Sequence, residues 1–318
     1  VPSDNDKSIQ PFNVLVVPYP YSINGTDFVN VTTSRIKPTH SSKTGYFDLE
    51  QNWLSQNNHP GNRSVSLKTR VLTLIENAQS EVDKVDMLLF PELSLDDSSY
   101  DELSTELEKQ YGDTLQMFVA GVKQKEDGIV RNVAKSTFYT AKSSNVETEQ
   151  KKHHRWKLDR SQIETYSISD SLDPTLDWWE DINIGKRELD FVVFRRGASF
   201  TTLICEDLAR IDPCQSAIRS IGPNLVFALL LDGPQLKGRW PERYALSLSD
   251  DPGCSVLTVT SLATVSRSNA MHNGTRQTIA MWKDPETGTK EIDLPSGYDA
   301  MLLNLTSSLR SEYTLDGR

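Results

Sequence analysis

Three short segments of the chain place a carboxylate, an amine and a thiol at the ends of strand-like runs. Glu92 ends the segment LLFPE, Lys152 lies in the cationic segment KKHHRWK, and Cys205 lies in TTLICEDL. An apolar run that ends in a polar residue indicates a buried strand whose carboxyl end opens into a site. Together these groups suit nucleophilic catalysis. The thiol attacks a carbonyl or nitrile carbon, the carboxylate takes and returns a proton, and the ammonium stabilises the thiolate or the oxyanion.

Each residue also has a structural interpretation. Glu92 could cap a helix, because carboxylates are common at helix starts. Cys205 alone is more often a small core residue. However, Glu206 and Asp207 follow Cys205 directly, and a thiolate beside two carboxylates needs a nearby cation to keep its pKa from rising. A lysine would supply that cation.

The order of the motifs, Phe-Pro-Glu, then a lysine, then Ile-Cys-Glu-Asp, resembles that of the carbon-nitrogen hydrolase (nitrilase and amidase) superfamily. The resemblance extends over residues 12 to 306. It implies an α/β fold built as a nitrilase-like four-layer α-β-β-α sandwich, often paired into dimers. It also implies a Glu-Lys-Cys triad of Glu92, Lys152 and Cys205, a thioester intermediate, and no metal or organic cofactor.

Two lysines compete for the middle position of the triad. Lys152 follows the strand-like run 148–150, as the family's lysine follows its strand. Lys157 precedes Glu164 by seven residues, close to the family's spacing to a second glutamate. We favour Lys152 and keep Lys157 as the alternative. Glu164 is the candidate for a second carboxylate that orients the lysine or a water molecule.

The resemblance places the substrate pocket near Glu206, directly after the nucleophile, and at the segment that begins with Asp232. The backbone N–H that follows Cys205 would share the oxyanion with the lysine. Many family members carry Tyr or Trp where this chain has Glu206. The substrate class therefore stays open between an amide, which we favour, and a nitrile.

The adjacent residues His153 and His154 suggest a metal site at first sight. Neighbouring residues on a strand point to opposite faces, and the other three histidines show no ligand-like spacing. We therefore expect no metal.

Composition limits the class of partner. The 318 residues are 37% hydrophobic and 25% charged, as in ordinary globular proteins. The net charge of −10 argues against a broad nucleic-acid-binding face. There is no apolar run near the ~20 residues of a membrane span and no recognisable export signal. Three cysteines do not make a disulfide framework, so we expect a cytoplasmic protein. The expected partners are a small-molecule substrate and further copies of the chain, without nucleic acid or membrane.

The chain is expected to consist of a polar linker or tail over 1–11 and a single nitrilase-like domain over 12–318. Long insertions are expected near 18–60 and 165–190. Hydrophobic periodicity and turn signals predict helices over 64–81, 96–109 and 207–220. They predict strands over 12–17, 85–90, 115–122, 130–140, 225–231, 255–260 and 300–305.

A second hypothesis treats the chain as an assembly or effector module of a larger protein. The segments ICEDLAR, DGPQL and RWPERY also resemble the nitrilase-like domain of some bacterial antiviral defence reverse transcriptases. On that resemblance, the nucleic-acid chemistry would belong to a separate amino-terminal domain.

Overall fold

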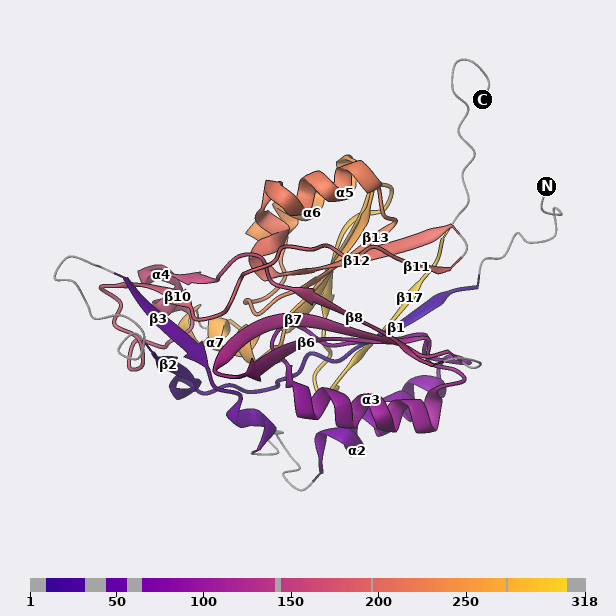
Figure 1. Cartoon of the computed structure of the whole chain (residues 1–318), viewed down its shortest axis with the longest axis horizontal. Coiled ribbons are helices and arrows are strands. Elements are labelled where there is room, and N and C mark those ends of the chain that lie inside the picture. Colours follow the sequence, from indigo (N-terminus) through magenta and orange to yellow (C-terminus); the bar gives the residue numbers. More distant parts are fainter. Residues whose placement is uncertain are drawn as a thin grey trace, which may run out of the picture.

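Two large β-sheets packed face to face form the centre of the molecule (Figure 1). The computed structural model describes residues 10–31, 44–55, 65–140, 144–195, 197–272 and 274–307. The first sheet has seven strands in the order β17-β1-β4-β6-β7-β8, with β5 pairing to β6. Its strands are β1 (Phe12–Val16), β4 (Met87–Leu89), β5 (Leu95–Asp96), β6 (Met117–Glu126), β7 (Ile129–Phe138), β8 (Val146–Lys151) and β17 (Met301–Leu305).

The second sheet has six strands in the order β11-β12-β13-β14-β15-β16. They are β11 (Val192–Arg195), β12 (Ala198–Ile204), β13 (Leu225–Leu229), β14 (Ser255–Val259), β15 (Thr278–Asp284) and β16 (Gly288–Asp293). The middle strands β12, β13 and β14 run parallel. They are rich in apolar residues because parallel strands are buried on both faces.

Alternation along β1 shows how the layers are specified. Val14 and Val16 belong to the core shared with the second sheet, whereas Leu15 and Val17 belong to the core under the outer helices. Successive strand residues point to opposite faces, so one apolar strand serves two cores. Each such side chain contributes about 1.5–3 kcal/mol when fully buried.

Helices cover the outer faces of both sheets and complete a four-layer α-β-β-α sandwich, as predicted (Figure 1). Helices α2 (Leu67–Gln79) and α3 (Asp97–Tyr111) lie on the first sheet, and α5 (Ser216–Ile221) and α6 (Trp240–Asp250) lie on the second. The side chains of Ser66 and Asp96 cap α2 and α3 by accepting backbone N–H groups. The other helical segments among the described residues are α4 (Arg160–Thr165), α7 (Leu262–His272), η1 (Gly25–Asp27), η2 (Asn52–Leu54), η3 (Cys205–Ala209) and η4 (Ile211–Gln215).

A third, four-stranded sheet was not predicted from the sequence. It has the order β2-β3-β10-β9 and consists of β2 (Phe28–Asn30), β3 (Thr44–Leu49), β9 (Lys157–Leu158) and β10 (Asp177–Glu180). Three of these strands come from the segments expected to be insertions, of which 32–43 and 56–60 lie outside the described residues. The described parts of the insertions therefore contribute a layer of structure rather than only irregular loops.

Most predicted elements are present, with boundaries shifted by a few residues. The helix predicted over 207–220 is wrong as a single element, because η3, η4 and α5 replace it. Asp212 has φ −115° and ψ 127° directly before Pro213. A residue that precedes proline is disfavoured in the helical region, which explains the break.

Two other sequence expectations can be compared with the fold. All three cysteines are free and buried, so the prediction of no disulfide framework is confirmed. Within the described ranges, every helix is too short or too polar to cross a membrane. Most of the predicted tail over 1–11 lies outside the described residues.

Candidate active site

The three residues singled out from the sequence follow three strands whose carboxyl ends meet. Glu92 lies three residues after β4, Lys152 directly follows β8, and Cys205 directly follows β12. Strands β4 and β8 belong to the first sheet and β12 to the second. Lys152 contacts Glu92 directly, and the charges of both act on the buried Cys205 thiol, so the packing of the two sheets brings the three side chains together.

Cys205 lies at a strained turn between β12 and η3. Its backbone φ is +46°, a value that residues other than glycine rarely adopt. Such strain is maintained only where the surrounding structure fixes it, and it clusters at functional sites. The thiol is 3% exposed, so its environment is almost entirely protein.

Glu92 and Lys152 form a buried ion pair. Lys152 Nζ donates to Glu92 Oε1 at 2.8 Å, and both side chains are about 1% exposed. The backbone N–H of Lys152 donates to the Asn132 carbonyl at 2.9 Å, which fixes the residue at the end of β8. Glu92 Oε2 is buried and has no hydrogen-bond partner among the described residues. One carboxylate oxygen is therefore held by the lysine, and the other has free lone pairs.

A second glutamate and an asparagine complete the cluster, and neither was predicted as a site residue. Glu180, at the end of β10, accepts from Lys152 Nζ through Oε2 at 2.6 Å. Asn132 Nδ2 donates to Oε1 of Glu92 at 2.8 Å and to Oε1 of Glu180 at 2.9 Å. The backbone N–H of Trp156 donates to Glu180 Oε2 at 2.9 Å. Lys152 is thus held between two carboxylates, and Asn132 links those carboxylates.

Burial and the neighbouring charges determine how these groups titrate. Burial raises the pKa of Glu92 above its ordinary value, although Lys152 opposes the shift. Burial would lower the pKa of Lys152, but Glu180 and Glu92 hold that pKa well above its ordinary value. Burial and the Glu92 charge raise the pKa of the Cys205 thiol, and Lys152 lowers it in part. The site therefore rests with a neutral thiol next to an ammonium and a carboxylate that can accept a proton.

Glycine at position 121 allows the Glu92 loop to approach strand β6. A Cβ atom at Gly121 would lie 2.4 Å from Glu92 Cα, 2.5 Å from the Pro91 carbonyl oxygen and 2.6 Å from Leu93 N. All three atoms belong to backbone, which yields little. The Gly121 N–H also donates to the Pro91 carbonyl at 3.1 Å. The position of Glu92 therefore depends on the absence of a side chain at Gly121.

The structure does not bring Lys157 and Glu164 into the cluster. Lys157 lies on β9, partly exposed, with Nζ 2.8 Å from the Asp177 carboxylate. Glu164 lies on α4 and accepts from Arg160 Nε at 2.8 Å in an exposed i,i+4 pair. The spacing of seven residues that suggested both positions reflects β9 and the following helix. The second carboxylate in contact with Lys152 is that of Glu180, 28 residues later in the chain.

Of the two residues expected near the substrate pocket, Glu206 lies closer to the surface than the cluster, and Asp232 is buried. Burial raises the pKa of Glu206, and Arg210 lies 3.5 Å from its carboxylate. Asp232 accepts from the Tyr166 hydroxyl at 2.7 Å, Arg239 Nη2 at 2.9 Å and Trp240 Nε1 at 3.1 Å. Because protein donors occupy both of its carboxylate oxygens, Asp232 holds the loop after β13 in place.

One group of side chains near the cluster has ligand types that suit a metal. The ligand atoms of His153, Asp207 and Cys214 lie within 4.8 Å of one another. Each already has a protein partner: His153 Nδ1 lies 3.4 Å from Cys214 Sγ, and the His153 backbone N–H donates to Asp207 at 2.9 Å. Burial raises the pKa of Cys214 to about 12, so its thiol keeps its proton at neutral pH. The expectation of no metal stays a prediction.

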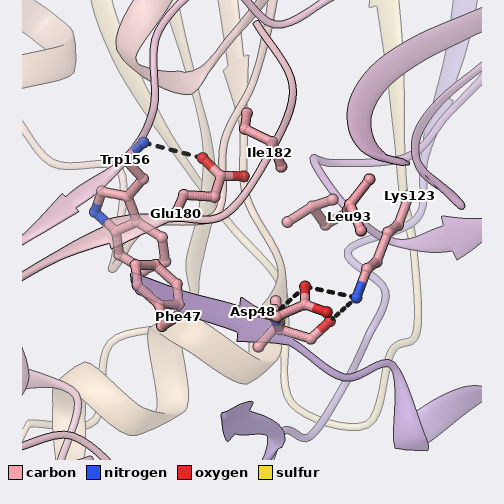
Figure 2. A pocket seen from close by; sticks show the side chains of 9 residues that line it. Phe47, Asp48, Leu93, Lys123, Trp156, Glu180 and Ile182 are labelled. Carbon is pink, nitrogen blue, oxygen red and sulfur yellow. Dashed lines mark hydrogen bonds and ion pairs between the residues drawn. The ribbon is translucent and has the colours of Figure 1, made fainter. Parts of the chain in front are cut away.

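A small cavity borders Glu180 on the side of Trp156 and Ile182 (Figure 2). Its volume is about 10 Å³, roughly the space of a single water molecule. The ion pair of Lys123 with Asp48, 2.7 Å long, also lines it. This cavity is too small for a substrate.

Comparisons with known proteins identify the fold but not a close relative. No family model and no curated protein matches the chain in sequence. Among solved structures, Nit3 of Saccharomyces cerevisiae, a member of branch 10 of the nitrilase superfamily, superposes with a TM-score of 0.53. It shares 11% identity, and the match covers 94% of this chain and 91% of Nit3.

Two further structures are similar to the same extent. A mutant of the Nesterenkonia AN1 amidase from the nitrilase superfamily has a TM-score of 0.51 and 10% identity over 93% of this chain and 90% of the amidase. A CN-hydrolase superfamily protein of Xanthomonas campestris, with an arsenic adduct in its active site, has a TM-score of 0.51 and 11% identity. That match covers 94% of this chain and 92% of the other. The chain therefore has the fold of the nitrilase, or CN-hydrolase, superfamily.

Proposed function

We propose that the chain hydrolyses a nonpeptide carbon-nitrogen bond, an amide in preference to a nitrile, with Cys205 as nucleophile. The observation that carries the proposal is the buried Glu92–Lys152 pair, 2.8 Å long, beside a cysteine at a strained strand end. The solved structures with the same fold include an amidase. The ammonium of Lys152 lowers the pKa of the Cys205 thiol in part, as a cation beside a nucleophilic cysteine should.

In the first half-reaction, Glu92 takes the Cys205 proton as the sulfur attacks the carbonyl carbon. The raised pKa of Glu92 makes it a stronger base than an exposed glutamate. The negative charge moves to the carbonyl oxygen, where Lys152 and the backbone N–H of Glu206 stabilise it. The carbon-nitrogen bond then breaks, Glu92 returns the proton to the leaving nitrogen, and the acyl group stays on the sulfur as a thioester.

In the second half-reaction, a water molecule replaces the amine. Glu92 removes a proton from this water as it attacks the thioester carbon, and Lys152 again stabilises the oxyanion. The carbon-sulfur bond breaks, the carboxylic acid leaves, and Glu92 returns the proton to the thiolate. Glu180 and Asn132 act as positioning residues, because they hold Lys152 and Glu92 at fixed distances.

The proposal is tested by incubating the protein with a panel of small amides and nitriles and measuring ammonia release. The proposal expects turnover with at least one amide and none with a Cys205→Ala variant of unchanged circular dichroism. Turnover that survives in Cys205→Ala would refute the assigned nucleophile.

A second candidate function, as an assembly module, is favoured by apolar side chains on the outer helical layer. Ile211, Ile221 and Leu246 are 67%, 57% and 43% exposed. They lie on η4, α5 and α6, where Arg219 of α5 hydrogen-bonds Ser247 of α6. A second copy of the chain covering this layer would bury them. Light scattering during size-exclusion chromatography tests this, since a strict monomer would count against it. The narrower resemblance to domains of defence-associated reverse transcriptases stays a prediction.

A further inference from the structure

An open pocket of about 380 Å³ is lined by residues close in sequence to the candidate active site, and its lining differs from that of the small cavity. The residues that line it, called here the basic pocket, are Tyr46, His154, Arg155, Trp179, Ile184 and Arg210. The volume falls within the range of small-molecule sites.

Three parts of the lining are close in sequence to the reactive groups. His154 follows Lys152 by two residues, which span at most about 7 Å of chain. Arg210 directly follows the short helix that Cys205 begins. Ile184 follows Glu180 by four residues. The lining therefore belongs to the same chain segments as the candidate triad. Because successive strand residues alternate, Trp179 lies on the face of β10 opposite to Glu180.

The charge of the basic pocket is opposite to that of the protein as a whole. The net charge of the chain is −10, yet two arginines and a histidine line this pocket, and none of the described residues that line it carries a carboxylate. Arg155 donates Nη2 to the Ile182 carbonyl at 2.8 Å and forms no ion pair within the described ranges. Its Nε is buried without a partner there. Arg210 is 47% exposed and has Glu206, 3.5 Å away, as its carboxylate neighbour.

His154 adds a ring nitrogen to this lining. Its Nδ1 lies 2.9 Å from Asp207 Oδ1. Because an ionised carboxylate can only accept, Nδ1 carries a hydrogen, and the bond fixes the ring orientation. Asp207 also accepts a hydrogen bond from the His153 backbone N–H, so both of its carboxylate oxygens already have protein donors. The carboxylates of Glu206 and Asp207 are thus both engaged by protein groups.

Two aromatic rings form one side of the basic pocket. Trp179 of β10 and Tyr46 of β3 are directly paired in a parallel register, so their side chains lie on the same face of the small sheet. Neighbouring rings on one face provide a flat, apolar surface on which a planar group can stack. Both rings come from the segments predicted as insertions.

From these observations we infer that the basic pocket binds a planar, aromatic anion, such as an aromatic carboxylate. Arg155 and Arg210 hold the carboxylate of this ligand, and the rings of Tyr46 and Trp179 contact its aromatic part.

The test compares two probes of the same shape and different charge. 4-Carbamoylbenzoate carries a carboxylate where 4-nitrobenzamide carries a neutral nitro group of similar size. Binding is measured by titration calorimetry with the Cys205→Ala protein, so that it does not depend on turnover. Ammonia release by the unmodified protein is measured separately with both probes.

Binding of the carboxylate probe should exceed that of the nitro probe by about tenfold, as expected for one charge-assisted contact. Arg210→Gln should weaken binding of the carboxylate probe by about fivefold to tenfold and leave the nitro probe unchanged. The matched control is Arg160→Gln, an exposed arginine on α4, which should change neither. Arg155→Lys should also weaken binding of the carboxylate probe, because a lysine ammonium cannot form the two parallel hydrogen bonds that a guanidinium forms with a carboxylate.

The two proposals can fail separately. Binding that depends on charge and on Arg210, without turnover of any amide, would support the basic pocket and overturn the hydrolase. Equal binding of both probes, or no effect of Arg210→Gln and Arg155→Lys, would overturn the basic pocket even if neutral amides are hydrolysed. Charge-dependent binding with matching charge-dependent turnover supports both.

Discussion

Replacement of Gly121 by alanine tests whether the position of Glu92 controls catalysis. The added Cβ would lie 2.4 Å from Glu92 Cα, whereas ordinary van der Waals contacts begin at 3.4 Å. The Glu92 loop must therefore move about 1 Å away from β6, and a displacement of that size at a catalytic residue can lower the rate by about 100-fold. The overpacking itself should cost about 1–3 kcal/mol of unfolding free energy.

The assay pairs ammonia release with urea denaturation of Gly121→Ala. The expected result is a large loss of kcat in a protein that remains folded at assay temperature. Gly185→Ala is the matched control, because its Cβ would meet only the end of the Asn183 side chain, at 3.1 Å. Full kcat in Gly121→Ala, with Gly185→Ala also unchanged, would show that the Glu92 loop does not control the reaction.

The remaining predictions concern charge in the cluster. Lys152→Met should abolish ammonia release while Lys157→Met retains it, because of the two lysines only Lys152 contacts Glu92. The opposite pattern would make Lys157 the lysine of the triad. Glu180→Gln should lower the unfolding free energy by about 3 kcal/mol in urea titrations, since one amide cannot accept from Lys152, Trp156 and Asn132 together. The acidic limb of kcat/KM should lie above pH 4.5, because burial raises the pKa of Glu92 and a protonated Glu92 cannot take the thiol proton; a limb at or below 4.5 would argue against this base. Asp207→Asn should lower kcat more than it raises KM, because Asp207 connects the Lys152 segment to the Cys205 loop by hydrogen bonds with His153 and His154. An unchanged kcat in steady-state kinetics would contradict that role.

The residues that could be found from the sequence are those marked by local pattern. Glu92 and Cys205 follow continuous apolar runs, because the strands that carry them are buried on both faces. Lys152 could be found for a similar reason, although β8 is more polar. Hydrophobic periodicity and turn signals also located several strands of the two large sheets, although β11, β15 and β16 were not predicted.

Glu180 could not be found in this way, because its position depends on pairing between distant segments. Strand β10 pairs with β3, more than a hundred residues earlier in the chain, and that register carries Glu180 to Lys152. Neighbouring charges such as Asp181 look equally plausible in the sequence. Glu164 fitted the expected spacing, yet its helix directs it to Arg160 at the surface. Asn132 could be placed on its strand, but its contacts with two carboxylates arise only in the packed fold.

The most direct test of the central claim is intact-mass spectrometry of the protein, acid-quenched during incubation with a panel of amides that includes 4-carbamoylbenzoate. A thioester at Cys205 adds the mass of the amide minus ammonia. The account predicts this adduct on the unmodified protein, its removal by hydroxylamine, and its absence from Cys205→Ala. No adduct with any amide, or an adduct on Cys214 or Cys254 instead, would contradict it.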